Sequence, residues 1–205
     1  MEKIRYFFSK IDNNFNKFNV ILSAIILLGI AFGAILAGNM NTDVLKKFNF
    51  FFFSDFEIKS SLNFISNFMS SLGASSIFFA TVFFMSFSIF GLVIIFLFVL
   101  LKGVGLGVIL GRLYVAYSIK GAIFGSCVLL PGAFFSVISL ILCASESIEF
   151  NLILTKKVIS FNEQNLMPAF LNYIKKVGTS GFVLIISAVV DSIFSLTLIK
   201  FFNFN

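Results

Sequence analysis

Two charged residues lie inside long apolar segments, and both are candidates for chemistry at membrane depth. Arg112 interrupts the apolar run that follows residue 103, and Asp191 interrupts the last apolar run of the chain. A single charge is costly to bury in lipid, so such residues usually pair or face a watery cavity. Two arrangements are open. Arg112 and Asp191 face each other inside the protein, or each side chain reaches the nearest membrane surface.

Other side chains that carry catalytic chemistry are scarce. The chain has no His, which removes imidazole bases and His-containing zinc sites. Glu146 and Glu149 form a carboxylate pair that suits acid–base chemistry, or they mark a membrane boundary. Cys127 and Cys143 would lie about 24 Å apart on one helix, too far for a disulfide, so we expect two free thiols. We predict no catalytic residue, no metal site and no cofactor, and therefore a protein that is not an enzyme.

The composition indicates that lipid is the solvent for most of this protein. Hydrophobic residues make up 59% of the 205 residues and charged residues only 12%, about half the charge of a soluble domain. We predict an all-α, polytopic bundle forming one transmembrane domain over residues 1–205. The net charge of +6 fits a lysine excess that orients the chain and attracts anionic headgroups. We do not expect nucleic-acid binding.

Five apolar segments are long enough to cross a bilayer. We place the spans at residues 20–38, 77–101, 103–119, 121–145 and 177–199. Segments 39–76 and 146–176 then lie on the membrane surface. Pro131 and Gly132 interrupt the fourth span, because proline removes a backbone donor and clashes with the preceding turn. We expect that helix to kink or break there.

Residues 1–18 form a basic segment with an apolar residue every three or four positions. This pattern favours an amphipathic helix lying flat at the headgroups, and a solvated basic tail is the other interpretation. With the first span placed in this way, nine Lys and Arg residues fall on the side of the N-terminus and five on the other. The positive-inside rule then predicts a cytosolic N-terminus and an external C-terminus.

Glycines recur four positions apart in three of the predicted spans. Small residues at this spacing line one helix face and let two membrane helices approach closely. A ligand or ion path lined by backbone is the alternative use of such glycines. No window reads G-x-G-x-x-G, so the pattern is not a dinucleotide fingerprint. The predicted helix-packing residues are Gly29, Gly33, Gly103, Gly107, Gly111, Gly121 and Gly125.

The segment from Leu101 to Pro131 carries a more specific pattern. It reads L-K-G, then Gly107 and Gly111, then K-G at Lys120, then L-L-P ending at Pro131. This pattern resembles the stage II sporulation protein M family. The resemblance implies a polytopic protein of the bacterial cytoplasmic membrane. In spore formers it anchors a complex that remodels peptidoglycan during engulfment of the forespore, and its partners there are wall-cutting enzymes. Some relatives carry a polar residue directly after the proline, where this chain has Gly132.

We therefore expect a non-enzymatic membrane scaffold that recruits partners for remodelling of the cell envelope. The expected partners are the lipid bilayer, other envelope membrane proteins including peptidoglycan hydrolases, and a second copy of the chain. The alternative is a permease or transporter subunit that works with a separate ATPase. The broken fourth helix, Arg112 and Asp191 favour that alternative, because discontinuous helices often form substrate sites.

Overall fold

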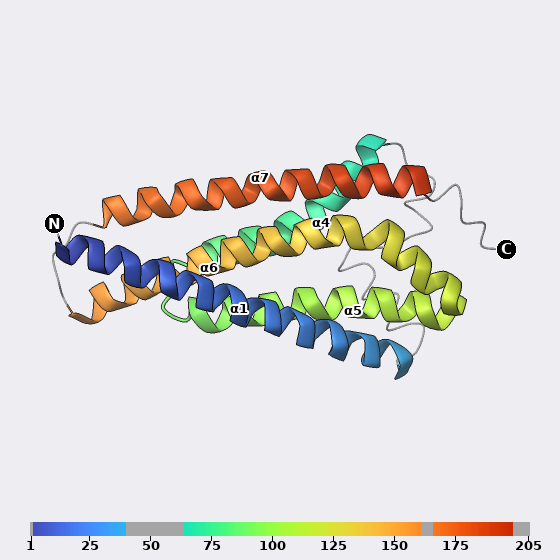
Figure 1. Ribbon diagram of the computed structural model, residues 1–205, viewed down its shortest axis with the longest axis horizontal. Coiled ribbons are helices and arrows are strands. Elements are labelled where there is room, and N and C mark those ends of the chain that lie inside the picture. Colours follow the sequence, from blue (N-terminus) through green and yellow to red (C-terminus); the bar gives the residue numbers. More distant parts are fainter. Residues whose placement is uncertain (1, 40–63, 161–165, 199–205) are drawn as a thin grey trace.

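The computed structural model describes residues 2–39, 64–160 and 166–198, which form a bundle of long helices (Figure 1). The elements are α1 (Glu2–Asn39), α4 (Phe64–Met85), α5 (Gly91–Phe124), the π-helix η1 (Gly125–Leu129), α6 (Leu130–Ser160) and α7 (Met167–Leu198). Five helical segments of the described chain are long and apolar enough to cross a membrane: Lys17–Gly38, Phe64–Met85, Gly91–Gly121, Gly125–Ile159 and Met167–Thr197. The predicted all-α, multi-pass membrane bundle with five spans is confirmed.

The helices run along one common direction, with the connections at the two ends of the bundle (Figure 1). At one end α1 begins, α4 passes into α5, and α6 ends near the start of α7. At the other end α5 turns back toward α6, and α7 ends. The first and last helices therefore have their outer termini at opposite ends, as an odd number of spans requires.

The second and third spans differ from the prediction. The predicted boundaries 77–101 and 103–119 are wrong, because the spans are α4 and the first part of α5. More than half of α4 comes from the predicted surface segment 39–76, whose residues 40–63 lie outside the described residues. Lys102, which we placed between two spans, and Gly103, which we placed at the start of the third, lie inside α5.

A turn over residues 86–90 separates α4 from α5, and long-range hydrogen bonds hold it. The side-chain amide of Asn151, on α6, donates to the carbonyl of Ser86 at 3.0 Å and to that of Ser88 at 2.6 Å. Gly91 fits against the backbone of Met85, where a methyl group would have no room. The turn contains no charge and no proline, so the hydropathy of this segment reads as one continuous run.

Two predicted surface segments are parts of longer helices. Residues 2–18 continue directly into the first span as α1. They are therefore not a separate helix that lies across the direction of the first span. The side chains of residues 2–16 lie outside the described set. The segment 146–176 belongs to the end of α6 and the start of α7, with residues 161–165 outside the description.

The predicted break near Pro131 takes the form of a π-helical turn just before it. In η1 the ring of hydrogen bonds widens, and the backbone N–H of Leu130 donates to the carbonyl of Gly125. Since Pro131 has no N–H, the carbonyls of this turn lack one donor that an α-helix would supply. The helix continues through Pro131 and Gly132 to Ser160. A sharper reversal lies earlier, at Ser118, where φ is 50° and ψ is −132°.

Candidate functional site

Close contact between α1 and α5 is made by glycines. A methyl group on Gly29 would lie 2.7 Å from the carbonyl oxygen of Leu100, and one on Gly103 would lie 2.6 Å from that of Ile26. A methyl group on Gly33 or Gly107 would meet the backbone of the facing helix more closely still, and one on Gly111 would lie 2.7 Å from the Cβ atom of Ala37. All five predicted glycines of this pair therefore lie in the α1–α5 interface, where any side chain would separate the helices.

Gly121 and Gly125 perform the same task inside the corner between α5 and α6. Gly121 lies on the backbone of Leu113, and a methyl group on Gly125 would lie 3.0 Å from the side chain of Leu110. Phe124 is fully buried beside Leu113. Residues 121–125 therefore pack directly against the preceding part of α5. The chain enters α6 from this close contact.

Arg112 lies close to the end of the first span along the bundle. Its neighbour Gly111 contacts Ala34 and Ala37 of α1, whose membrane segment ends at Gly38. That segment has 22 residues, about 33 Å of helix, which matches a hydrocarbon core of about 30 Å. Exposed tyrosines follow at 114 and 117, as in the aromatic belts of membrane surfaces. The geometry favours the arrangement in which Arg112 reaches the nearest surface.

Lys102 lies midway between Gly91 and Arg112 on α5, at the middle of the span, and its residue is only 8% exposed. Its ammonium lies 5.0 Å from the centroid of the Phe78 ring, a cation–π contact. Ser75, one turn before Phe78 on α4, shares a 3.1 Å hydrogen bond with Ser136 of α6. Our sequence reasoning missed this group, because a lysine next to glycine suggested a helix end.

Asp191 is 7% exposed and lies against the start of α6. A methyl group on Gly132 would lie 2.5 Å from the Asp191 Cβ atom and 2.8 Å from its Oδ1 atom. One turn earlier on α7, the Ser187 hydroxyl donates to the Gly132 carbonyl at 2.9 Å. Among the described residues, no ion pair joins Asp191 to Arg112. The absence of a side chain at Gly132 gives the buried aspartate its room.

Polar side chains continue along the whole contact between α6 and α7. The Ser139 hydroxyl donates to the Ser180 carbonyl at 2.7 Å, and Ser147 shares a 3.1 Å hydrogen bond with the Tyr173 hydroxyl. That hydroxyl also donates to the carbonyl of Phe83 on α4 at 3.3 Å. A heptad-like spacing of small and polar residues in the sequence could have predicted this contact. It runs through Gly132, Ser136, Ser139, Cys143 and Ser147 on α6, and through Tyr173, Val177, Ser180, Leu184, Ser187 and Asp191 on α7.

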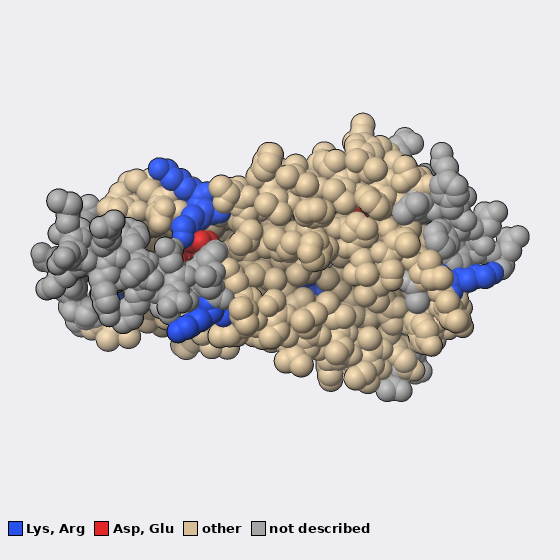
Figure 2. Space-filling view, viewed as in Figure 1, with Lys and Arg blue, Asp and Glu red and all other residues tan. Residues whose placement is uncertain are grey.

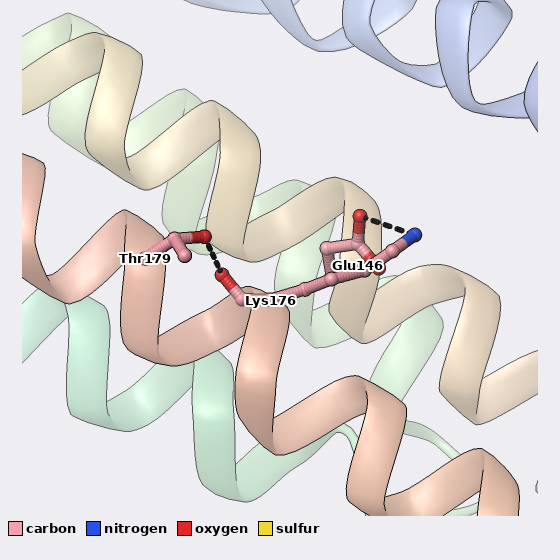
Figure 3. Close-up of polar contacts among 3 residues, drawn as sticks. All are labelled: Glu146, Lys176 and Thr179. Atoms are coloured by element: carbon pink, nitrogen blue, oxygen red, sulfur yellow. Dashed lines mark hydrogen bonds and ion pairs between the residues drawn. The ribbon is translucent and has the colours of Figure 1, made fainter.

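An ion pair lies toward the opposite end of this polar contact. Lys176 Nζ lies 2.9 Å from Glu146 Oε1, as Figure 3 shows. The Thr179 hydroxyl donates to the Lys176 carbonyl at 2.6 Å within α7. Glu146 is buried and Glu149, on the next turn, is partly buried. Glu146 therefore links two helices through an ion pair, a role that the sequence did not predict.

The remaining candidate ligands are dispersed. Both cysteines are free thiols, with Cys127 exposed on η1 and Cys143 buried in α6. Within residues 2–39, 64–160 and 166–198, no three His, Cys, Asp or Glu residues come together as a metal-ion group.

No family model, curated protein or solved structure matches this chain. The resemblance to the stage II sporulation protein M family consequently rests on residues 101–131, whose glycines form the α5 side of one helix contact and the corner toward α6.

Proposed function

We propose that this protein is a non-enzymatic membrane scaffold that anchors or recruits partners for remodelling of the cell envelope. One observation carries the proposal: three buried polar side chains hydrogen-bond to other segments of the bundle. Ser139, Ser187 and Asn151 each donate to a backbone carbonyl on another element. Hydrogen bonds of this kind hold membrane helices in fixed positions, which suits a rigid platform.

The resemblance at Leu101 to Pro131 supports the choice of process. In the stage II sporulation protein M family, the membrane component anchors enzymes that cut peptidoglycan. The glycines of this segment that pack on α1 and α5 would provide the same kind of compact membrane anchor here. We propose a location in a bacterial cytoplasmic membrane, with the N-terminus in the cytosol and the C-terminus outside.

Affinity capture from native membranes tests the scaffold. The intact chain, solubilised in mild detergent, should retain peptidoglycan hydrolases or their membrane-bound regulators. The matched control is the Gly33→Leu variant, in which the α1–α5 contact has no room for the side chain, so that the same partners should be lost. Recovery of an ATPase in stoichiometric amount, with no wall enzyme, would contradict the scaffold.

A transporter subunit is the second candidate, and two buried charges favour it. Lys102 lies at the middle of its span, and Asp191 lies against the region where η1 passes into α6. Ionisable groups inside spans often line solute paths. Under this alternative, Lys102→Met and Asp191→Asn would abolish uptake in intact cells while partner capture stays normal. Under the scaffold proposal, neither substitution changes uptake of any solute.

A further inference from the structure

Lysines from three helices gather toward the end of the bundle where α1 begins. They are Lys17 on α1, Lys156 and Lys157 on α6, and Lys175 and Lys176 on α7. Figure 2 shows basic side chains toward this end, around an acidic group, while the middle of this face carries little charge. Helices that are far apart in the sequence therefore contribute to one basic surface.

The basic surface keeps a clear positive excess after its acidic neighbours are counted. At this end, the described side chains comprise five lysines and two glutamates, which leaves a net charge of +3. At the other end they comprise Arg112 and Lys120, which leaves +2, because Asp191 is buried inside the bundle. Lys17, Lys156 and Lys175 are exposed, whereas Lys176, which binds Glu146 at 2.9 Å, is half-buried.

The depth of this surface matches the headgroup layer of a bilayer. Lys17 is the first residue of the span Lys17–Gly38, which is one hydrocarbon thickness long. Lys175 lies two residues after Tyr173, whose ring stacks on Phe83 near the end of α4. Lysines at such positions extend their ammonium groups toward the lipid phosphates.

We propose that Lys17, Lys156 and Lys175 bind the phosphate groups of anionic phospholipids at this end of the bundle. A lysine ammonium is a compact charge that binds phosphate without fixed orientation, which suits mobile headgroups. Each lysine near an anionic membrane surface strengthens binding about fivefold, so the three together account for about 100-fold. Bound lipid would bridge α1, α6 and α7 from outside and stabilise the bundle.

The buried thiol of Cys143 provides the readout, because the chain has no Trp and this cysteine is 0% exposed. The intact chain with Cys127→Ser is heated in neutral detergent with a fluorogenic maleimide that reacts when Cys143 becomes accessible. Phosphatidylglycerol should raise the midpoint temperature more than phosphatidylcholine with the same acyl chains. The difference should vanish near 1 M salt, where the screening length falls to about 3 Å.

Matched variants locate the effect. Lys17→Gln, Lys156→Gln and Lys175→Gln together should raise the phosphatidylglycerol concentration that gives half of the temperature shift about 100-fold. Lys175→Gln alone should raise it about fivefold. Lys120→Gln, an exposed lysine at the other end, should respond as the parent does. The proposal is overturned if both lipids act equally, if the lysine variants respond as the parent does, or if Lys120→Gln loses the response. It is also overturned if inorganic phosphate reproduces the shift, since the ligand is then free phosphate.

Discussion

Ser118 turns the chain back inside α5, six residues before its end, with φ at 50° and ψ at −132°. Glycine adopts this combination readily, whereas a residue with a Cβ atom is strained there by about 1–3 kcal/mol. We predict that Ser118→Gly raises the free energy of unfolding by about 1 kcal/mol. The gain is smaller than the strain, because glycine also loses more backbone entropy on folding. The midpoint of Cys143 exposure on heating, in a Cys127→Ser background, measures it.

Ser118→Ala is the control for this prediction, because it removes the hydroxyl and keeps the Cβ atom. It should leave the midpoint unchanged or lower it. An equal rise in both variants would mean that the hydroxyl, and not the backbone angle, is the source of the change.

At the scale of the helices, the features that the sequence predicted have local causes. The features that it did not predict arise from contacts between helices that are distant in the sequence. The glycines of α1 and α5 repeat every four residues, so their shared helix face is visible in the sequence. The turn before α5 is fixed by Asn151, which lies on another helix, and no local pattern records that contact. Lys102 was placed at a helix end for the same reason, since Phe78 of α4 covers it only in the folded bundle.

The π-turn illustrates an intermediate case. Pro131 correctly indicated disturbed helix geometry, because the loss of its N–H is a local property. The sequence could not show that the disturbance falls over Gly125–Leu129 and leaves α6 continuous. In the folded bundle, Ser187 and Asp191 of α7 pack against Gly132 at the start of α6, and no local sequence pattern records these contacts.

The α1–α5 contact gives a prediction at this scale. In the Gly33→Ala variant, the new methyl group would clash with the backbone of Val104. Backbone cannot rotate away, so we predict a loss of about 1–3 kcal/mol or more in the free energy of unfolding. The same Cys143 accessibility assay measures it.

Gly178→Ala is the matched substitution on α7, where the added methyl group would meet nothing within 4 Å. Alanine is the better helix former by about 0.8 kcal/mol, so this variant should be slightly stabilised. Similar losses in both variants would show that helix packing at Gly33 is not the cause.

For the whole molecule, charge and helix length define one position in a bilayer. The spans of α1 and α4 are each 22 residues long, and Arg112 lies near the end of the α1 span. The ion pair of Glu146 and Lys176 lies toward the other border. Within these borders Lys102 and Asp191 are buried charges, and the outward-facing lysines lie beyond them. The same division separates five described basic side chains at one end from two at the other.

This asymmetry predicts the orientation of the protein, because the side richer in Lys and Arg stays in the cytosol. Two variants are made in a chain with Cys127→Ser and Cys143→Ser. Lys120→Cys places a single cysteine at one end of the bundle, and Lys156→Cys places one at the other end. A membrane-impermeant maleimide should label Lys120→Cys in intact cells and Lys156→Cys only after permeabilisation. The reverse pattern would put the N-terminus outside. Labelling of both variants from one side would contradict the bundle itself, since α5 carries Lys120 to the end opposite the lysines of α6 and α7.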